Sequence, residues 1–344
     1  MSFSVGIVGL PNAGKSTLFK SLTKKPIDIA SYPFTTISPN VGIVTIPDER
    51  LEKISEVVSP DKTTPTVVEF VDIAGLIKGA HKGEGLGNQF LAQIRECDAI
   101  LNAVRAFRAD LVEHTEKTVD PERDIEIIKI ELIMKDMETA EKVSRGLEKD
   151  SKSKDKEIIK KLNLLKKINQ GLGEGKKITE ISLSEEEMFG IKEFQFLTSK
   201  PMIHVFNISD ENPYPIKPGS LTVNLKYEEE ISDLSEPEKK ELGTESHLDQ
   251  IILACYNALE LITFYTASGK KEARAWTLKK GSTCPQAGSK IHSDFEKKFI
   301  RADVIHWDQL IKAGNWAKAK ELGWLKTVGK DYIVVDGNVI EFKI

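Results

Sequence analysis

The sequence predicts an α/β protein with a mostly parallel, doubly wound sheet that carries helices on both faces. Apolar runs of strand length alternate with helical stretches, which is typical of βαβ units. A long charged helical segment interrupts this alternation, and a region with a different sequence pattern follows it. We therefore expect a sheet domain over residues 1–121 and 198–258, an inserted helical arm over 122–197, and a small α+β domain over 259–344.

Five apolar segments are expected to form the strands of the sheet domain. The predicted strands cover residues 3–10, 66–76, 97–107, 200–213 and 220–229. A helix is expected over 14–24, directly after the first strand. Because only a glycine-rich turn separates the two, this strand–turn–helix unit is the part of the chain with the most specific local structure.

The inserted segment predicts a helical hairpin. Apolar residues recur at Ile125, Ile128, Leu132 and Met137, and a second helical pattern covers 156–172. The segment is basic, with ten Lys/Arg against five Asp/Glu between residues 141 and 167. Such a hairpin is either a solvated structural arm or an arm that docks a partner, and a polyanion such as RNA would suit its charge.

The C-terminal region predicts a strand, a Lys-Lys-Gly turn, a proline-initiated helix, and a closing hairpin over 331–344 across the Asp-Gly-Asn turn. Nine Lys/Arg stand against three Asp/Glu between residues 264 and 301. Basic residues interleaved with Trp276 and Phe299 suit RNA. We expect these two rings to fill the small core instead, and His292 and Asp294 to serve a helix cap or the surface.

Composition places the chain among soluble globular proteins, with 40% hydrophobic and 30% charged residues and a net charge of −4. No apolar run approaches the about 18 residues of a membrane span. Cys97, Cys255 and Cys284 are scattered, which argues against a zinc site or disulfide framework and suits a reducing cytoplasm. We expect all three thiols to be buried small hydrophobes.

The segment from Gly9 to Ser16 matches the pattern of a P-loop in full and lies between the first predicted strand and its helix. Backbone N–H groups of such a loop surround phosphate oxygens, and the helix N-terminus adds partial positive charge. Lys15 is expected to reach the β- and γ-phosphates, and the Ser16 hydroxyl to ligate Mg²⁺. Residues Asn12 to Thr17 are therefore candidate nucleotide-binding residues: Asn12, Ala13, Gly14, Lys15, Ser16 and Thr17.

A second motif, Asp72-Ile-Ala-Gly75, ends another apolar strand 57 residues after Lys15. The Asp72 carboxylate is expected to face the magnesium shell, and the Gly75 N–H to sense the γ-phosphate. Thr35 and Thr36 lie between the two motifs, and we favour Thr36 as a further hydroxyl ligand of Mg²⁺. Together these parts predict loops that order with the γ-phosphate and relax on its loss.

The P-loop segment, the segment "FTTISPN", the glycine-rich stretch after Asp72 and the segment from Arg274 to Ala302 resemble the YchF/Obg-like ATPase subfamily of Obg-related P-loop GTPases. The similarity extends over essentially the whole chain. The resemblance implies a G domain, a helical arm, a TGS domain of β-grasp (ubiquitin-like) fold, ATP hydrolysis and association with ribosomes.

The base-reading segment departs from the usual N-K-x-D pattern. It reads Asn207-Ile208-Ser209-Asp210, without the lysine, which is similar to the N-x-x-E of the subfamily, in which adenine is preferred. Asn207 is expected to pair with adenine. Asp210 stands where glutamate is usual, however, and Asn224-Leu225-Lys226 ends in a lysine as GTPases do. We expect ATP to be preferred to GTP, with Ile208, Asp210, Asn224 and Leu225 near the base.

The residues expected to catalyse hydrolysis are Lys15, Gly75 and His114. Leu76 occupies the place of a water-orienting glutamine, so unaided hydrolysis should be slow. His114 matches a histidine of the subfamily, although an exposed loop histidine is an equal alternative, and His81 is a weaker candidate. Asn12 resembles the asparagine of potassium-activated relatives, which implies a K⁺ site.

The sequence thus predicts a Mg²⁺-dependent ATPase that acts as a nucleotide-controlled switch on the ribosome. One alternative is a GTPase of the Obg type. A second alternative is a nucleotide-gated RNA- or ribosome-binding module with negligible turnover, and Leu76 is the residue that favours it.

Overall fold

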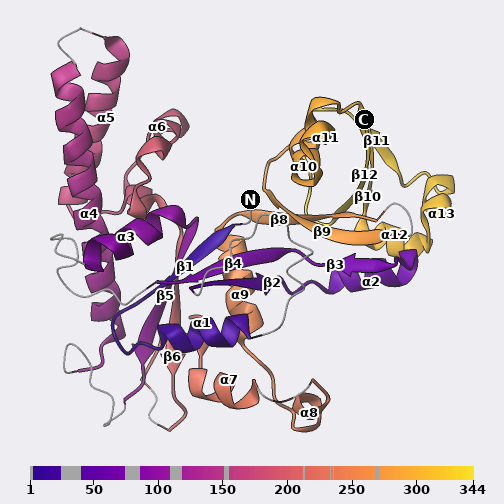
Figure 1. Cartoon of the computed structure of the whole chain (residues 1–344), viewed down its shortest axis with the longest axis horizontal. Helices are drawn as coiled ribbons and strands as arrows, with labels where there is room; N and C mark the ends of the chain where they lie inside the picture. Colours follow the sequence, from indigo (N-terminus) through magenta and orange to yellow (C-terminus); the bar gives the residue numbers. More distant parts are fainter. Residues whose placement is uncertain are drawn as a thin grey trace.

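The computed structural model describes residues 3–24, 40–73, 86–108, 118–150, 155–211, 214–232, 234, 236–267 and 271–344. In these ranges the chain forms two six-stranded sheets and a long helical arm (Figure 1). The arm and the second sheet lie at opposite ends of the first sheet. This arrangement confirms the predicted α/β class with its inserted helical hairpin.

The first sheet has the strand order β2-β4-β1-β5-β6-β7 and is parallel except where β2 pairs with β4. Its strands are β1 (Ser4–Val8), β2 (Val41–Thr45), β4 (Val67–Asp72), β5 (Ala99–Ala106), β6 (Met202–Ile208) and β7 (Thr222–Val223). The fifth predicted strand is therefore much shorter than expected. The Asn224 side chain caps helix α7 (Leu225–Ile231), and this cap ends the strand.

Helices cover both faces of this sheet because its central strands are apolar on both sides. Helices α1 (Lys15–Thr23) and α9 (Leu248–Ala258) pack on the face that includes Val5 and Leu101. Helices α3 (Leu86–Glu96) and α4 (Pro121–Asp150) pack on the face that includes Val8 and Ile100. Continuous burial of β5 is what a central parallel strand requires.

The arm consists of α4 and α5 (Lys156–Gly173), which pack through Ile133, Ala140, Leu165 and Ile168. Asp136 of α4 holds the chain that returns to the sheet. Its carboxylate accepts hydrogen bonds of 2.7 Å from Leu197 N, Thr198 N and Thr198 Oγ1. The intervening elements are η4 (Ile178–Glu180), α6 (Glu185–Gly190), η5 (Lys192–Phe194) and η6 (Leu197–Ser199).

The second sheet has the order β11-β10-β12-β8-β9-β3. Its C-terminal strands are β8 (Leu261–Thr266), β9 (Glu272–Lys279), β10 (Arg301–His306), β11 (Lys326–Val328) and β12 (Asn338–Lys343). The remaining helices are α8 (Glu236–Glu241), α10 (Cys284–Ile291), α11 (Ser293–Lys297), α12 (Trp307–Ala313) and α13 (Trp316–Glu321). The strand, turn and proline-initiated helix over 272–291 are confirmed, whereas the TGS assignment stays a prediction.

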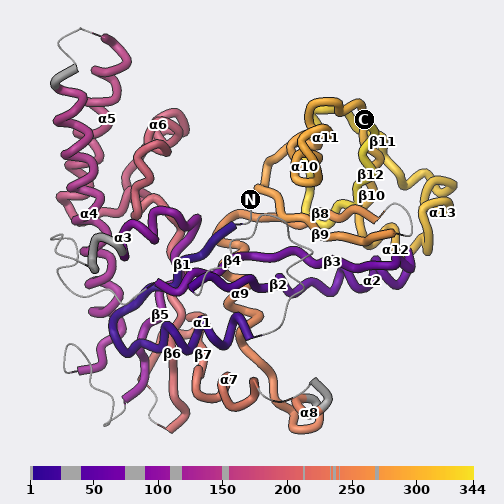
Figure 2. The backbone as a smooth tube through the Cα atoms, viewed as in Figure 1, coloured from indigo at the N-terminus to yellow at the C-terminus, as the bar shows by residue number. Residues whose placement is uncertain are grey.

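One strand of this sheet comes from the N-terminal part of the chain. Strand β3 (Lys62–Thr64) pairs with β9, and helix α2 (Glu49–Val58) buries Leu51 and Ile54 against the same sheet. The two elements lie beside the C-terminal strands (Figure 2). The predicted boundary at residue 259 is therefore crossed by a segment of the first domain.

Side-chain contacts also join this N-terminal segment to the C-terminal region. Asp48 caps α2 and accepts hydrogen bonds from Arg50 and from the Tyr265 hydroxyl. Arg50 also pairs with Asp336 at 2.6 Å. The α2 segment and the C-terminal region are consequently joined by a hydrogen bond and an ion pair as well as by apolar packing.

The predicted hairpin over 331–344 is wrong. Both edges of β12 are occupied, one by β10 and the other by β8, so no edge is left for residues 331–335. Those residues turn to the start of α10, where Cys284 N donates to Tyr332 O and Val334 N donates to Ser282 O. The turn itself forms, with Asn338 N donating to Val335 O.

Smaller predictions about the C-terminal region and about the three cysteines are confirmed. Phe299 is buried, and Trp276 packs against the same core. Cys97, Cys255 and Cys284 are all buried. His292 caps α11, its Nδ1 accepting from Asp294 N.

Replacing Asp136 by Asn should lower the free energy of unfolding by about 1–3 kcal/mol, because one of two buried N–H groups then faces an amide NH₂. Burial raises the pKa of Asp136 to about 6. The native protein therefore binds this proton more tightly than the unfolded chain, and the stability that the carboxyl contributes falls as the pH rises toward about 6.

Urea unfolding of wild type and Asp136→Asn tests this expectation. The decrease in the free energy of unfolding that Asp136→Asn causes should be larger at about pH 5 than at about pH 7.5. A difference that grows toward the higher pH would contradict it.

Candidate functional site

The P-loop lies between β1 and α1 at the carboxyl edge of the first sheet and packs tightly against its neighbours. A Cβ on Gly9, whose φ is 155°, would lie 2.4 Å from Ala103 O on β5. A Cβ on Gly14, whose φ is 97°, would lie 2.6 Å from Asn207 Nδ2 and 2.8 Å from Leu225 Cδ1. Both positions require glycine, for lack of space and for backbone conformation.

Lys15 begins α1 and is buried, with its Nζ donating to Leu10 O at 2.9 Å. Burial lowers the pKa of Lys15, and the Asp72 carboxylate acts in the opposite direction. Asp72 ends β4, where it is the partner of Ile7 on β1. The structure thus brings the predicted residues Lys15 and Asp72 to one place, next to the exposed Ser16 at the start of the helix.

Asn207 joins the P-loop to the start of α7. Its Nδ2 donates to Ala13 O and its Oδ1 accepts from Leu225 N, both at 3.3 Å, and the residue is buried. Both polar groups of the amide therefore have partners within the protein. The contact with adenine that the sequence predicts for Asn207 stays a prediction.

A cavity of about 500 Å³ opens beside the P-loop, a volume within the range of small-molecule sites. It is bounded by the P-loop and by the ends of β5, β6 and β7. Its lining includes seven of the predicted residues: Asn12, Gly14, Thr17, Asn207, Ile208, Asn224 and Leu225. Asp210 lines a neighbouring cavity of about 460 Å³ and not this one.

Sequence reasoning missed part of the lining. Phe107 and Arg108 follow β5, while Glu211 and Glu229 come from the loop after β6 and from α7. The position of Phe107 and Arg108 at the carboxyl end of the predicted strand over 97–107 was a usable signal, because ligands bind at the carboxyl ends of such strands. Lys226 also lines the cavity and pairs with Glu211 at 3.2 Å.

Several predicted site residues lie outside the described residues: Thr35, Thr36, Gly75, Leu76, His81 and His114. Among the described ranges, no group of three or more His, Cys, Asp or Glu residues is arranged to hold a metal ion. The donors present near Lys15 are the Ser16 hydroxyl and the Asp72 carboxylate. Oxygen donors of this kind fit Mg²⁺, which usually binds through one or two protein ligands together with substrate phosphates.

Comparison with protein families gives two matches. The model described as "50S ribosome-binding GTPase" matches residues 4–165. The model of the C-terminal region of YchF GTPases, described as "Protein of unknown function (DUF933)", matches residues 261–344.

Curated relatives match over the full length. The "Ribosome-binding ATPase YchF" of Bacillus subtilis is 46% identical, with 100% of this chain and 99% of that protein covered. The protein of the same name from Escherichia coli O157:H7 is 45% identical, with 99% of each covered.

The chain belongs to the YchF family.

A solved YchF structure has the same architecture. It is described as the Schizosaccharomyces pombe YchF GTPase, and it matches with a TM-score of 0.86 at 36% identity, covering 99% of this chain and 98% of that one. The YchF fold therefore includes the arm and the C-terminal sheet as well as the P-loop domain. Within the described residues, no helix is both long enough and apolar enough to cross a bilayer.

Gly14→Ala should weaken nucleotide binding and destabilise the protein, because the new methyl group displaces Asn207 and Leu225. Gly281→Ala is the matched control, since Gly281 has a similar φ of 84° but nothing within 4 Å of its added Cβ. Both variants incur the left-handed backbone strain of about 1–2 kcal/mol. Only Gly14→Ala should lose affinity for ATP in calorimetry, and equal ATP affinities for the two variants would refute the close packing.

Proposed function

We propose that this chain binds and hydrolyses a purine nucleoside triphosphate, with ATP preferred to GTP, and that it binds ribosomes under control of the bound nucleotide. The observation that carries the proposal is the P-loop, closely packed at Gly9 and Gly14, next to a cavity of nucleotide size. Full-length similarity to proteins named ribosome-binding ATPases supports both activities. The proposed location is the cytoplasm, because the protein can bind ribosomes there.

The P-loop residues bind and orient the triphosphate in this proposal. The N-terminus of α1 presents backbone N–H groups and partial positive charge to the phosphates. Lys15 already donates to a carbonyl at the loop, and a phosphate oxygen is a stronger acceptor because it is charged. When bound, Mg²⁺ supplies positive charge to the β- and γ-phosphate oxygens. Ser16 and Thr36 are its proposed protein ligands, Asp72 is proposed to act on it through water, and K⁺ at Asn12 is a further proposal.

The nucleotide preference rests on the cavity and on the names of the relatives. Phe107 lines the cavity and offers a ring on which a purine can stack. The bacterial relatives are named ATPases, whereas the fission-yeast structure is described as a GTPase. A GTPase therefore remains the second candidate function, and the two are separated by measured affinities.

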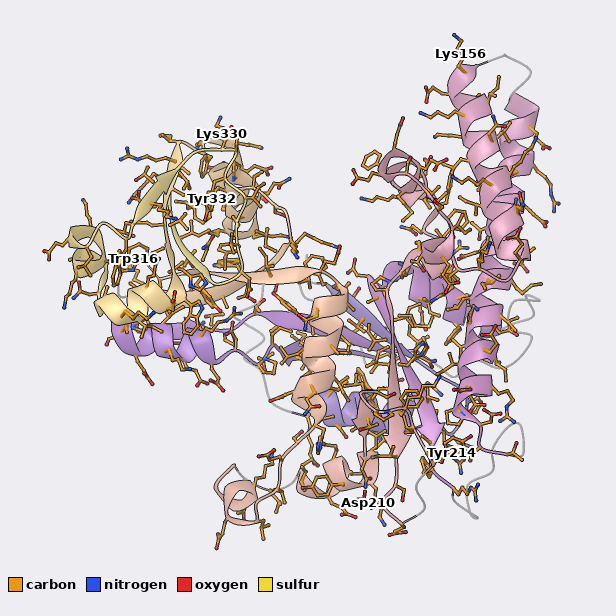
Figure 3. All side chains as sticks on the ribbon, turned by 180° about the vertical axis from the view of Figure 1, so that it is seen from behind. Lys156, Asp210, Tyr214, Trp316, Lys330 and Tyr332 are labelled. Carbon is orange, nitrogen blue, oxygen red and sulfur yellow. The ribbon has the colours of Figure 1, made fainter. Side chains whose placement is uncertain are left out.

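The proposed ribosome contact lies away from the nucleotide cavity. Figure 3 shows Lys156 at the tip of the arm and Lys330 on the C-terminal region, with Asp210 at the opposite edge of the molecule. Three arm lysines, Lys160, Lys161 and Lys167, pair with glutamates of the arm itself. Part of the basic charge of the arm is thus neutralised within the arm, which favours the C-terminal region, with its exposed Lys297 and Arg301, as the more basic contact surface.

Lys15→Ala should weaken ATP binding by about 10- to 150-fold, because hydrogen bonds to charged groups contribute about 1.5–3 kcal/mol. Lys20→Ala is the control, since Lys20 is exposed on the same helix. Calorimetry with ATP and GTP measures the affinities, and co-sedimentation with ribosomes measures the switch. Ribosome binding that responds to the same ATP concentration in the Lys15→Ala variant as in the wild type would contradict the proposal.

His114→Ala should slow single-turnover hydrolysis while ATP affinity is unchanged, if His114 approaches the γ-phosphate as the sequence predicts. The measurement is a single-turnover rate at saturating protein. A variant that hydrolyses ATP at the wild-type rate would leave Lys15 and the α1 N-terminus as the proposed catalytic groups, without the histidine.

A further inference from the structure

The Asp210 carboxylate is held by Asn224 at the edge of the nucleotide cavity. Asp210 Oδ2 accepts a hydrogen bond of 2.9 Å from Asn224 Nδ2. Asp210 follows β6, and Asn224 precedes α7, so the contact joins the two loops that flank the cavity. A carboxylate at this position is the group expected to read guanine, which makes its environment important for the choice of base.

Asn224 has a single favourable orientation in this arrangement. Its Oδ1 caps α7 by accepting from Tyr227 N at 3.2 Å. The amide nitrogen must therefore point to Asp210, because a flipped amide would place Oδ1 against the carboxylate and NH₂ against the Tyr227 N–H. The cap of the helix and the restraint on Asp210 are thus made by one side chain.

The two cavities show on which side the carboxylate lies. Asn224 and Ile208 line both cavities. Asp210 lines only the second, with Tyr227 and His247, whereas Gly14 and Thr17 line only the first. The Asn224 side chain therefore separates Asp210 from the cavity that is continuous with the P-loop.

We propose that Asn224 is a positioning residue that sets the purine preference, because it holds the Asp210 carboxylate away from the base. This inference rests on the proposed nucleotide site. Guanine presents two adjacent donors, N1–H and the 2-amino group, that a carboxylate can accept. Adenine has an acceptor at N1 and no 2-amino group, so it loses nothing when the carboxylate is turned away.

Two other carboxylate side chains, those of Glu211 and Glu229, line the first cavity. Glu211 is paired with Lys226 at 3.2 Å, and Glu229 lies in the second turn of α7. Variants of Asn224 alter neither residue directly. A variant that also removes Asp210 therefore identifies which carboxylate is responsible for any change in preference.

Asn224→Ala should release Asp210 and improve GTP affinity relative to ATP by about fivefold or more, the size of a good bidentate base contact. Asn224→Gly should do the same with little loss of helix stability, since glycine is a tolerated N-cap. Affinities for ATP, GTP and ITP are measured by calorimetry on the full chain. GTP should gain more than ITP, because ITP lacks the 2-amino group.

Two controls separate positioning from helix capping. Asn315→Ala removes the same type of cap, from α13 in the C-terminal region, where Asn315 accepts from Lys318 N. It should leave the ATP/GTP ratio unchanged. As a single substitution, Asp210→Ala should change the affinities for ATP and GTP by less than twofold. In the Asn224→Ala background, Asp210→Ala should abolish the gain in GTP affinity.

The inference is overturned if either Asn224 variant leaves the ATP/GTP ratio unchanged or shifts it toward ATP. It is also overturned if Asp210→Ala alone weakens GTP binding severalfold, because Asp210 would then already read the base. If the wild type binds none of the three nucleotides, the proposed function fails instead, and the two failures are distinguishable.

Discussion

The buried amide of Asn207 is the contact on which the nucleotide site depends. It holds Ala13 of the P-loop and Leu225 at the start of α7 at once, so the phosphate-binding loop and the wall of the cavity keep a common geometry. Gly14 allows the close approach that this requires, since a side chain there would collide with Asn207. Because an unpaired buried amide is costly, the arrangement persists only while both partners are in place.

The C-terminal sheet also constrains the nucleotide site, because it includes a strand from the segment between the predicted magnesium-site residues Thr36 and Asp72. Residues between Thr36 and Asp72 form β2, α2, β3 and β4, and α2 with β3 pack on the C-terminal sheet. The Asp48–Arg50–Asp336 contacts strengthen that packing. A displacement of Asp72 would therefore act on a segment that is anchored at both sheets, which gives the nucleotide site a direct structural connection to the C-terminal region.

Sequence patterns predicted most of the sheet domain and the arm because these parts depend on local periodicity. The P-loop was recognised from its glycines, lysine and hydroxyl residue, and the arm from apolar residues at helical spacing. The failures have a common cause. Residues 331–335 match a hairpin, but β12 has no free edge, and β3 is a short polar strand whose partner, β9, is more than 200 residues away. Neither fact can be inferred from neighbouring residues.

For the site, the sequence by itself determined which residues have the chemistry for phosphate and magnesium: Gly14, Lys15, Ser16 and Asp72. These residues belong to motifs whose spacing implies their placement at the ends of parallel strands. Only the tertiary structure decided that the Asn207 amide bonds to the P-loop and to Leu225, that Phe107 and Arg108 line the cavity, and that Asp210 lines a neighbouring cavity instead. Hydrogen-bond partners of a side chain are chosen by whatever the fold brings within about 3 Å, and that choice is not local in sequence.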